Sequence, residues 1–186
     1  PTAARLCGPL ARQWLRAPEV PPGTGLRVMH FNVLADCLAR SAPLFSAKRG
    51  FRCGSEALEW GHRSGLLQQE LGRHGCDIIS LCEVDRYDDF FEPTLAAQGF
   101  SGTFRRKRSP AKDGVALFWR RDRFEEGLRR SVFLEQGSHR TPGQQVALLQ
   151  RLRLAPTAGS AARPRSVVVC STHLRASAYD RLRMQQ

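Results

Sequence analysis

IISLCEVD, residues 78–85, is an apolar run that ends in acidic residues. A short run of this kind predicts a strand covered on both faces, and we place that strand at residues 77–84. Glu83 lies near its end, where a carboxylate in partly dry surroundings is costly unless a positive group holds it. An arginine or a divalent cation could supply that positive charge. For Glu83 taken alone, one of the chain's many arginines is the simpler explanation.

The composition indicates a globular domain with a basic surplus. The chain has 186 residues, 41% of them hydrophobic, and Lys+Arg 29 against Asp+Glu 17 give a formal net charge of +12. This surplus favours phosphate-bearing partners such as nucleic acid, nucleotides or anionic lipid. Arginine, glycine or proline interrupts every apolar run before it reaches the roughly 18 to 20 residues of a membrane-spanning helix. We therefore expect no transmembrane segment, and a soluble or peripheral monomer.

The cysteines and the N-terminal segment bear on location. The six cysteines are irregularly spaced without a C-x-x-C pair, which favours free thiols in a reducing compartment over a disulfide framework or a zinc site. Residues 1–25 form a basic leader and a Pro/Gly linker, typical either of the tail of a mitochondrial targeting segment or of a disordered leader. The first residue, Pro1, suggests a processed or partial product. The expected location is cytoplasmic, mitochondrial or both.

The pattern along the chain predicts strands and helices in a mixed order. A first strand at 26–33 is followed by a long loop over 36–55, with Ser55 as the N-cap of a helix from 56 to about 73. A second helix within 88–98 begins late because of Pro93. Further strands are expected at 102–107, 114–120, 146–154 and 166–172, with turns at 113–114, 142–143 and 157–164. This order predicts a mixed α/β sandwich rather than a parallel doubly wound sheet.

Three of the predicted strand ends carry polar groups used in catalysis. VMHFNVLAD contains Asn32, IISLCEVD contains Glu83 and VVVCSTHL contains His173. Mg²⁺ takes oxygen ligands and is commonly held by one or two carboxylates, which suits Glu83 with an amide nearby. An imidazole can hydrogen-bond a phosphoryl oxygen or orient the attacking water. Alone, Asn32 is more often a turn former and His173 a packed or surface histidine, so the hypothesis rests on their conjunction.

Five segments in a fixed order resemble one known family. They are HFNVLAD, EALEWGHR, CDIISLCEVDRYDDFFEPTLAAQGFSGTF, KDGVALFW and STHLRAS. The resemblance is to the exonuclease, endonuclease and phosphatase superfamily, within its branch of nocturnin and the carbon catabolite repression deadenylases, and it runs from about Leu26 to the C-terminus. It implies a four-layer α/β/β/α sandwich with the active site at strand ends between the sheets. Residues 26–186 are then the N-terminal part of a single domain that is incomplete at its C-terminus.

The resemblance also implies roles for individual residues. Glu83 matches the metal-binding glutamate, Asn32 the asparagine near metal and phosphate, and His173 the histidine that contacts the scissile phosphate. A further set matches substrate-binding positions: Lys107, Asp113 and Arg175, the last in place of a lysine. Ser177 departs from the pattern, because nocturnin has a phosphate-binding arginine there.

The function implied by the resemblance is Mg²⁺-dependent phosphoester hydrolysis. The favoured reaction is removal of the 2′-phosphate of NADP⁺ and NADPH; the alternatives are 3′-to-5′ removal of poly(A) from RNA and a truncated, non-catalytic interaction protein. The family's GDFN and SDH segments do not occur in these 186 residues, so we expect residues 1–186 alone to be inactive and poorly folded. The basic run Arg105-Arg106-Lys107-Arg108 either draws in a polyanionic substrate or is a solvated loop.

Overall fold

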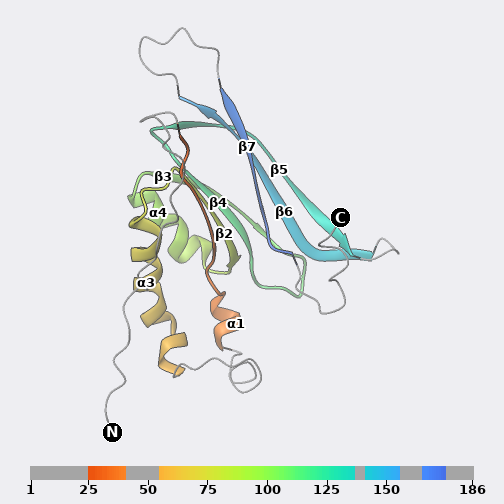
Figure 1. Ribbon diagram of the computed structural model, residues 1–186. Helices are drawn as coiled ribbons and strands as arrows, with labels where there is room; N and C mark the ends of the chain where they lie inside the picture. Colours follow the sequence, from red (N-terminus) through yellow and green to blue (C-terminus); the bar gives the residue numbers. More distant parts are fainter. Residues whose placement is uncertain (1–24, 41–54, 137–140, 156–164, 175–186) are drawn as a thin grey trace.

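Two β-sheets pack face to face, and helices cover the other face of the first sheet (Figure 1). The computed structural model describes residues 25–40, 55–136, 141–155 and 165–174. The first sheet has the order β1-β2-β4-β3 and the second the order β5-β6-β7. The strands are β1 (Val28–Asn32), β2 (Ile78–Val84), β3 (Phe100–Arg106), β4 (Gly114–Arg120), β5 (Phe124–Gln136), β6 (Thr141–Leu154) and β7 (Ser166–Thr172). The predicted α/β sandwich is thereby confirmed.

Among the described strands, one pair is parallel. β1 and β2 run parallel, so their C-terminal ends meet at one edge of the first sheet, whereas all other pairs are antiparallel. The helices are α1 (Asp36–Arg40), the 3₁₀ turn η1 (Ser55–Leu58), α3 (Trp60–Gly72), the π-helical turn η2 (Tyr87–Phe91) and α4 (Glu92–Ala97). No described helix is long and apolar enough to cross a membrane.

The two faces of β2 are buried in different cores. Ile79, Leu81 and Val84 pack against α3 and α4, in a core that also contains Leu71 and Leu95. On the opposite face, Ile78 and Cys82 pack between the sheets, against residues of β4 and β6. A helix layer, the first sheet and the second sheet therefore follow one another, and β2 is covered on both sides as its apolar run predicts.

Several local predictions were wrong. α1 lies in the segment expected to be loop, and η1 precedes α3, whose N-cap is Glu59 rather than Ser55. Pro142 pairs with Glu135 inside the β5–β6 ladder, so no turn lies at 142–143. β5 was not predicted because many of its side chains are exposed and charged residues interrupt its apolar ones, and its stability comes from pairing with β6.

The described cysteines have free thiols, as predicted. Cys37 is half-buried, Cys76 and Cys82 are buried, and Cys170 is exposed. The remaining two, Cys7 and Cys53, lie outside the described residues, as do the leader and the turn predicted at 157–164.

Candidate active site

Asn32, Glu83 and His173 meet at one end of the sandwich. The Asn32 Nδ2 donates a hydrogen bond of 2.9 Å to Glu83 Oε1. The His173 Nδ1 lies 3.7 Å from the same oxygen, and within the described residues it has no hydrogen-bond partner. No described arginine forms an ion pair with Glu83, and Arg175 lies outside the described residues. The three side chains come from the ends of β1, β2 and β7.

A β-bulge turns Glu83 toward the other two residues. The register between β2 and β4 shifts between Cys82 and Val84, and Glu83 has a φ of 58°. Without the bulge, strict alternation would place Glu83 on the helix-covered face with Ile79 and Leu81. Because of the bulge, Val84 and not Glu83 packs on the helix-covered face, and Glu83 lies at the edge between the sheets. A positive φ at a residue other than glycine is strained, and such strain is typical of functional positions.

Asn32 orients Glu83 because both ends of its own amide are engaged. Its Oδ1 accepts a hydrogen bond of 2.9 Å from the Leu34 backbone N–H, in a turn where Leu34 has a φ of 55°. The Nδ2 is then left facing the glutamate. Asn32 is thus a positioning residue in this arrangement, with its amide oxygen occupied by the backbone.

Arg63, a buried residue of α3, hydrogen-bonds to the backbone of this turn. It was not predicted as a site residue. Its Nη2 donates to the carbonyl oxygens of Val33 and Leu34, and the side chain is buried. Burial lowers the pKa of Arg63, and the carboxylates of Asp36, Asp85 and Glu83 oppose that shift. The signal in the sequence was a charged residue on the apolar face of α3, at helical spacing from Trp60 and Leu67.

Next to these three residues, a polar layer of Ser80, Ser171 and His30 connects the same three strands. The Ser80 Oγ donates a hydrogen bond of 2.8 Å to Ser171 Oγ, and the exposed His30 ring lies with Nδ1 at 3.0 Å from Ser80 Oγ. Ser80 and Ser171 are 4% and 1% exposed, so their hydroxyls have no access to bulk water. These residues precede Asn32, Glu83 and His173 on the same three strands. The layer therefore fixes how β1, β2 and β7 sit relative to one another.

Lys107 and Asp113 form an ion pair with 2.5 Å between Nζ and Oδ2. Their side chains are 9% and 7% exposed, so the Lys107 charge is already balanced by a carboxylate. The Lys107 N–H also donates to the Asp113 carbonyl, which closes the loop between β3 and β4. Both predicted residues are thus brought together near the site edge. The third predicted substrate contact, Arg175, lies outside the described residues, as does Ser177.

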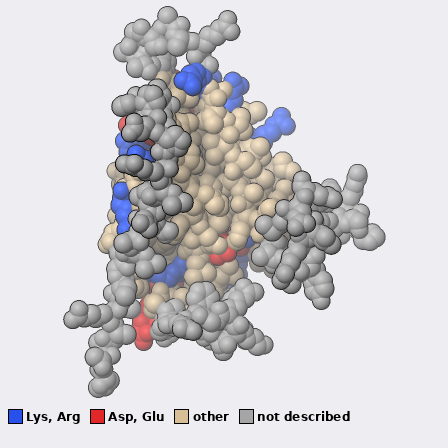
Figure 2. All heavy atoms as spheres, in the orientation of Figure 1, with Lys and Arg blue, Asp and Glu red and all other residues tan. Residues whose placement is uncertain are grey.

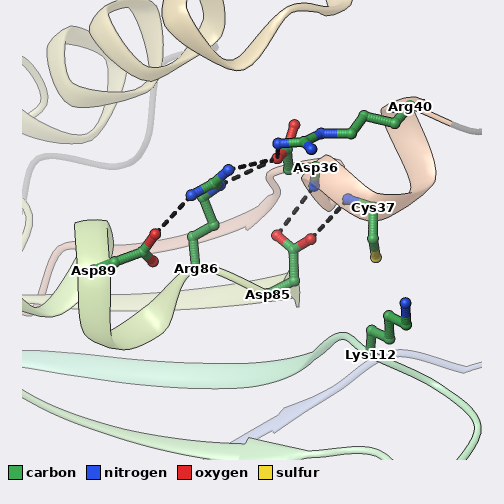
Figure 3. Close-up of a pocket in the computed structure, with 7 residues that line it drawn as sticks. All are labelled: Asp36, Cys37, Arg40, Asp85, Arg86, Asp89 and Lys112. Carbon is green, nitrogen blue, oxygen red and sulfur yellow. Dashed lines mark hydrogen bonds and ion pairs between the residues drawn. The ribbon is translucent and has the colours of Figure 1, made fainter.

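A pocket of about 410 Å³ adjoins this edge (Figure 3). The Asp85 carboxylate accepts hydrogen bonds from the backbone N–H groups of Asp36 and Cys37, which caps the short helix α1. Asp36 is held by Arg40 and Arg86: burial raises the pKa of its carboxyl, but the two arginine hydrogen bonds bring it below the usual value. Burial and then Asp85 raise the pKa of the Cys37 thiol to about 11, so at neutral pH this thiol is protonated and unreactive.

The donor set fits a hard divalent cation only in part. Glu83 is the carboxylate available between Asn32 and His173, and Mg²⁺ is commonly held by one or two carboxylates together with water and substrate phosphate. No group of three or more His, Cys, Asp or Glu residues that could hold a metal is found in the described part of the chain. Among the described residues, Glu83 is the carboxylate placed between Asn32 and His173 where an ion could be held.

Comparison with known proteins places the sequence in a defined group. The model of the Endonuclease/Exonuclease/phosphatase family matches residues 29–185. Human nocturnin is 32% identical over 171 residues, which are 87% of this chain and 37% of that protein. Bovine 2′,5′-phosphodiesterase 12 is 32% identical over 146 residues, 77% of this chain and 23% of that protein. The chain thus spans less than half the length of these relatives.

Solved structures give the same result for the fold. The human nocturnin catalytic domain with bound sulfate matches with a TM-score of 0.64 and 29% identity, covering 85% of this chain and 53% of that one. ANGEL2, described as a 2′,3′-cyclic phosphatase, matches with a TM-score of 0.66 at 20% identity, over 81% of this chain and 41% of that one. At this identity the ANGEL2 match concerns the fold alone.

Proposed function

Because the chain belongs to the Endonuclease/Exonuclease/phosphatase family, we propose that the complete protein is a Mg²⁺-dependent phosphoester hydrolase with Glu83 as a metal ligand. The observation that supports this most directly is the meeting of Asn32, Glu83 and His173 at one edge between the sheets. A scaffold has no physical need for a strained glutamate held by an amide and faced by an imidazole. The trio therefore favours catalysis over a purely structural role.

Each residue has a separate task in this proposal. A bound Mg²⁺ would supply a Lewis acid that polarises the phosphate. Asn32 keeps the Glu83 carboxylate in one orientation through the 2.9 Å hydrogen bond. His173, whose ring lies with Nδ1 3.7 Å from Glu83 Oε1, would donate to a phosphoryl oxygen or orient water.

The substrate we propose is the 2′-phosphate of NADP⁺ and NADPH, by analogy with nocturnin relatives at 31% to 32% identity. A second candidate is 3′-to-5′ removal of poly(A) from RNA. It is favoured by the exposed arginines at the end of β3, because a row of cations suits a polymer that carries one charge per nucleotide. Cytoplasmic or mitochondrial action is part of the same proposal.

A paired assay on the natural full-length protein tests both reactions. Phosphate release from NADPH and shortening of an oligo(A) RNA are measured with Mg²⁺ and with EDTA, for the wild type, Glu83→Gln and the matched control Glu92→Gln, which changes an exposed glutamate of α4. We expect Glu83→Gln to lower kcat at least about 100-fold, as loss of a positioned catalytic group does, and Glu92→Gln to have no effect. Turnover that survives Glu83→Gln or EDTA would remove Glu83 from its metal role.

A further inference from the structure

Arg63 links the helix layer to the turn that follows Asn32. Figure 2 shows basic side chains at the margins of the described surface, whereas Arg63, on α3, is 8% exposed. Its Nη2 donates a hydrogen bond of 2.6 Å to the Val33 carbonyl oxygen and a second hydrogen bond to the Leu34 carbonyl oxygen. Within the described residues, Arg63 is the donor to both oxygens. A single buried cation therefore holds the two residues that come directly after Asn32.

The stability of α3 does not account for a cation at this position. Arg63 is the fourth residue of the helix, near the positive end of the helix dipole, where acidic residues are favoured. Burial adds a second cost and lowers the pKa of Arg63, although the carboxylates of Asp36, Asp85 and Glu83 oppose that shift. The contacts that offset these two costs are the hydrogen bonds to the turn. The position is thus explained by the turn and not by the helix.

The conformation of the turn decides where the Asn32 amide points. Leu34 has a φ of 55°, which a residue with a Cβ adopts only where surrounding contacts enforce it. In this conformation the Leu34 N–H donates a hydrogen bond of 2.9 Å to Asn32 Oδ1, and Asn32 Nδ2 donates one of 2.9 Å to Glu83 Oε1. The hydrogen bond from Arg63 to the Leu34 carbonyl oxygen is a contact that enforces it. Without Arg63, Leu34 can return to a negative φ, and the Asn32 amide loses the N–H that fixes its orientation.

We propose that Arg63 is a positioning residue of the candidate site, which fixes the turn and, through Asn32, the Glu83 carboxylate. Its burial keeps it from touching a substrate, so it acts through the turn. The catalytic consequence rests on the proposed hydrolysis, whereas the effect on the turn does not. Removal of a group that orients a metal-binding residue typically lowers metal affinity or activity about 10- to 100-fold. We expect an effect of this size from Arg63, although it lies on a helix outside the two sheets.

The test combines amide hydrogen exchange with steady-state kinetics in the natural full-length protein. Arg63→Met removes the donors and the charge, and Arg63→Lys keeps the charge but ends about one bond short of Nη2. In Arg63→Met, exchange of the Leu34 N–H in the absence of metal should be at least about 10-fold faster, because hydrogen bonds from a charged donor are lost. With Mg²⁺, kcat on the substrate that the wild type hydrolyses should fall at least about 10-fold, with KM nearly unchanged. Arg63→Lys should shift both values in the same direction by a smaller factor, and it decides the question if Arg63→Met does not fold.

The matched control is Leu71→Ala, which removes a buried side chain of α3 about 12 Å along the helix from Arg63. It should lower Tm, as the Arg63 variants do, but leave the exchange of the Leu34 N–H and kcat near the wild-type values. Unchanged Leu34 exchange in the Arg63 variants, or an equal loss of kcat in Leu71→Ala at an equal loss of Tm, would overturn the proposal. A wild type that is inactive on both NADPH and oligo(A) RNA would refute the proposed function instead, and Leu34 exchange would still show whether Arg63 holds the turn.

Discussion

The strained backbone at Glu83 predicts that glycine is more stable than alanine at this one strand position. Glu83 has a φ of 58°, a region that costs a residue with a Cβ roughly 1 to 2 kcal/mol and costs glycine nothing. Glycine in turn loses more backbone entropy on folding, about 0.5 to 1 kcal/mol relative to alanine in a strand. The expected balance is that Glu83→Gly unfolds with a free energy about 1 kcal/mol higher than Glu83→Ala.

The comparison isolates the backbone because both variants remove the carboxylate. Both lose the 2.9 Å hydrogen bond from Asn32 and the approach of His173, so these losses cancel in the difference. A second pair, Val168→Gly and Val168→Ala, provides the control at an exposed position of β7. There glycine should be the less stable of the two, by about 0.5 to 1 kcal/mol, because the backbone is an ordinary strand.

Urea denaturation of the four variants in the natural full-length protein measures the differences, and thermal unfolding should show them as roughly 2 to 4 °C for each kcal/mol. Both Glu83 variants should lack activity. If glycine proves less stable than alanine at position 83, as at position 168, the bulge does not place this residue at positive φ. The argument that the bulge aims Glu83 at the inter-sheet edge would then fail.

Three further perturbations test the surroundings of the site. Ser171→Ala removes the acceptor of the buried Ser80 hydroxyl and should lower the free energy of unfolding by about 1 to 3 kcal/mol. In a double-mutant cycle followed by urea denaturation, Ser80→Ala/Ser171→Ala should lower it by less than the two single variants together. Gly114→Ala would bring a Cβ to 2.3 Å from a β3 carbonyl oxygen and should lower the free energy of unfolding by more than about 1 kcal/mol. Gly61→Ala, at a position of α3 with open space around it, should raise it by about 0.5 to 1 kcal/mol in the same assay. The pKa of Asp36 is lowered in the folded protein, so its contribution to stability is present above the usual carboxyl value of 3.8 and is lost as pH falls through the lower folded pKa. Asp36→Asn should therefore flatten the decline of Tm below pH 4, measured by thermal unfolding.

Elements whose signals are local could be predicted from sequence, and elements held by distant partners could not. The bounds of β4 and β7 agree with the predicted strands at 114–120 and 166–172, because apolar runs between turn residues mark them. α1 was missed because it is five residues long and depends on the Asp85 carboxylate, which reaches its N-terminus from beyond β2. β5 was missed because its charged, exposed sequence lacks alternation, and pairing with β6 decides its conformation.

Asn32, Glu83 and His173 could be singled out from the sequence, but the geometry that brings them together could not. On β1 and β7 the candidate site residue follows the polar layer by two residues, from His30 to Asn32 and from Ser171 to His173. Alternation therefore keeps each pair on one face of its strand. On β2 the step from Ser80 to Glu83 is three residues, and alternation alone would turn Glu83 to the helices. The bulge supplies the extra residue, at the cost of a positive φ, and Val84 returns to the helix-covered core. No local signal marks this bulge, since CEV reads as uninterrupted strand. The approach of Glu83 to Asn32 and His173 therefore depends on a backbone irregularity that only the pairing of β2 with β4 reveals.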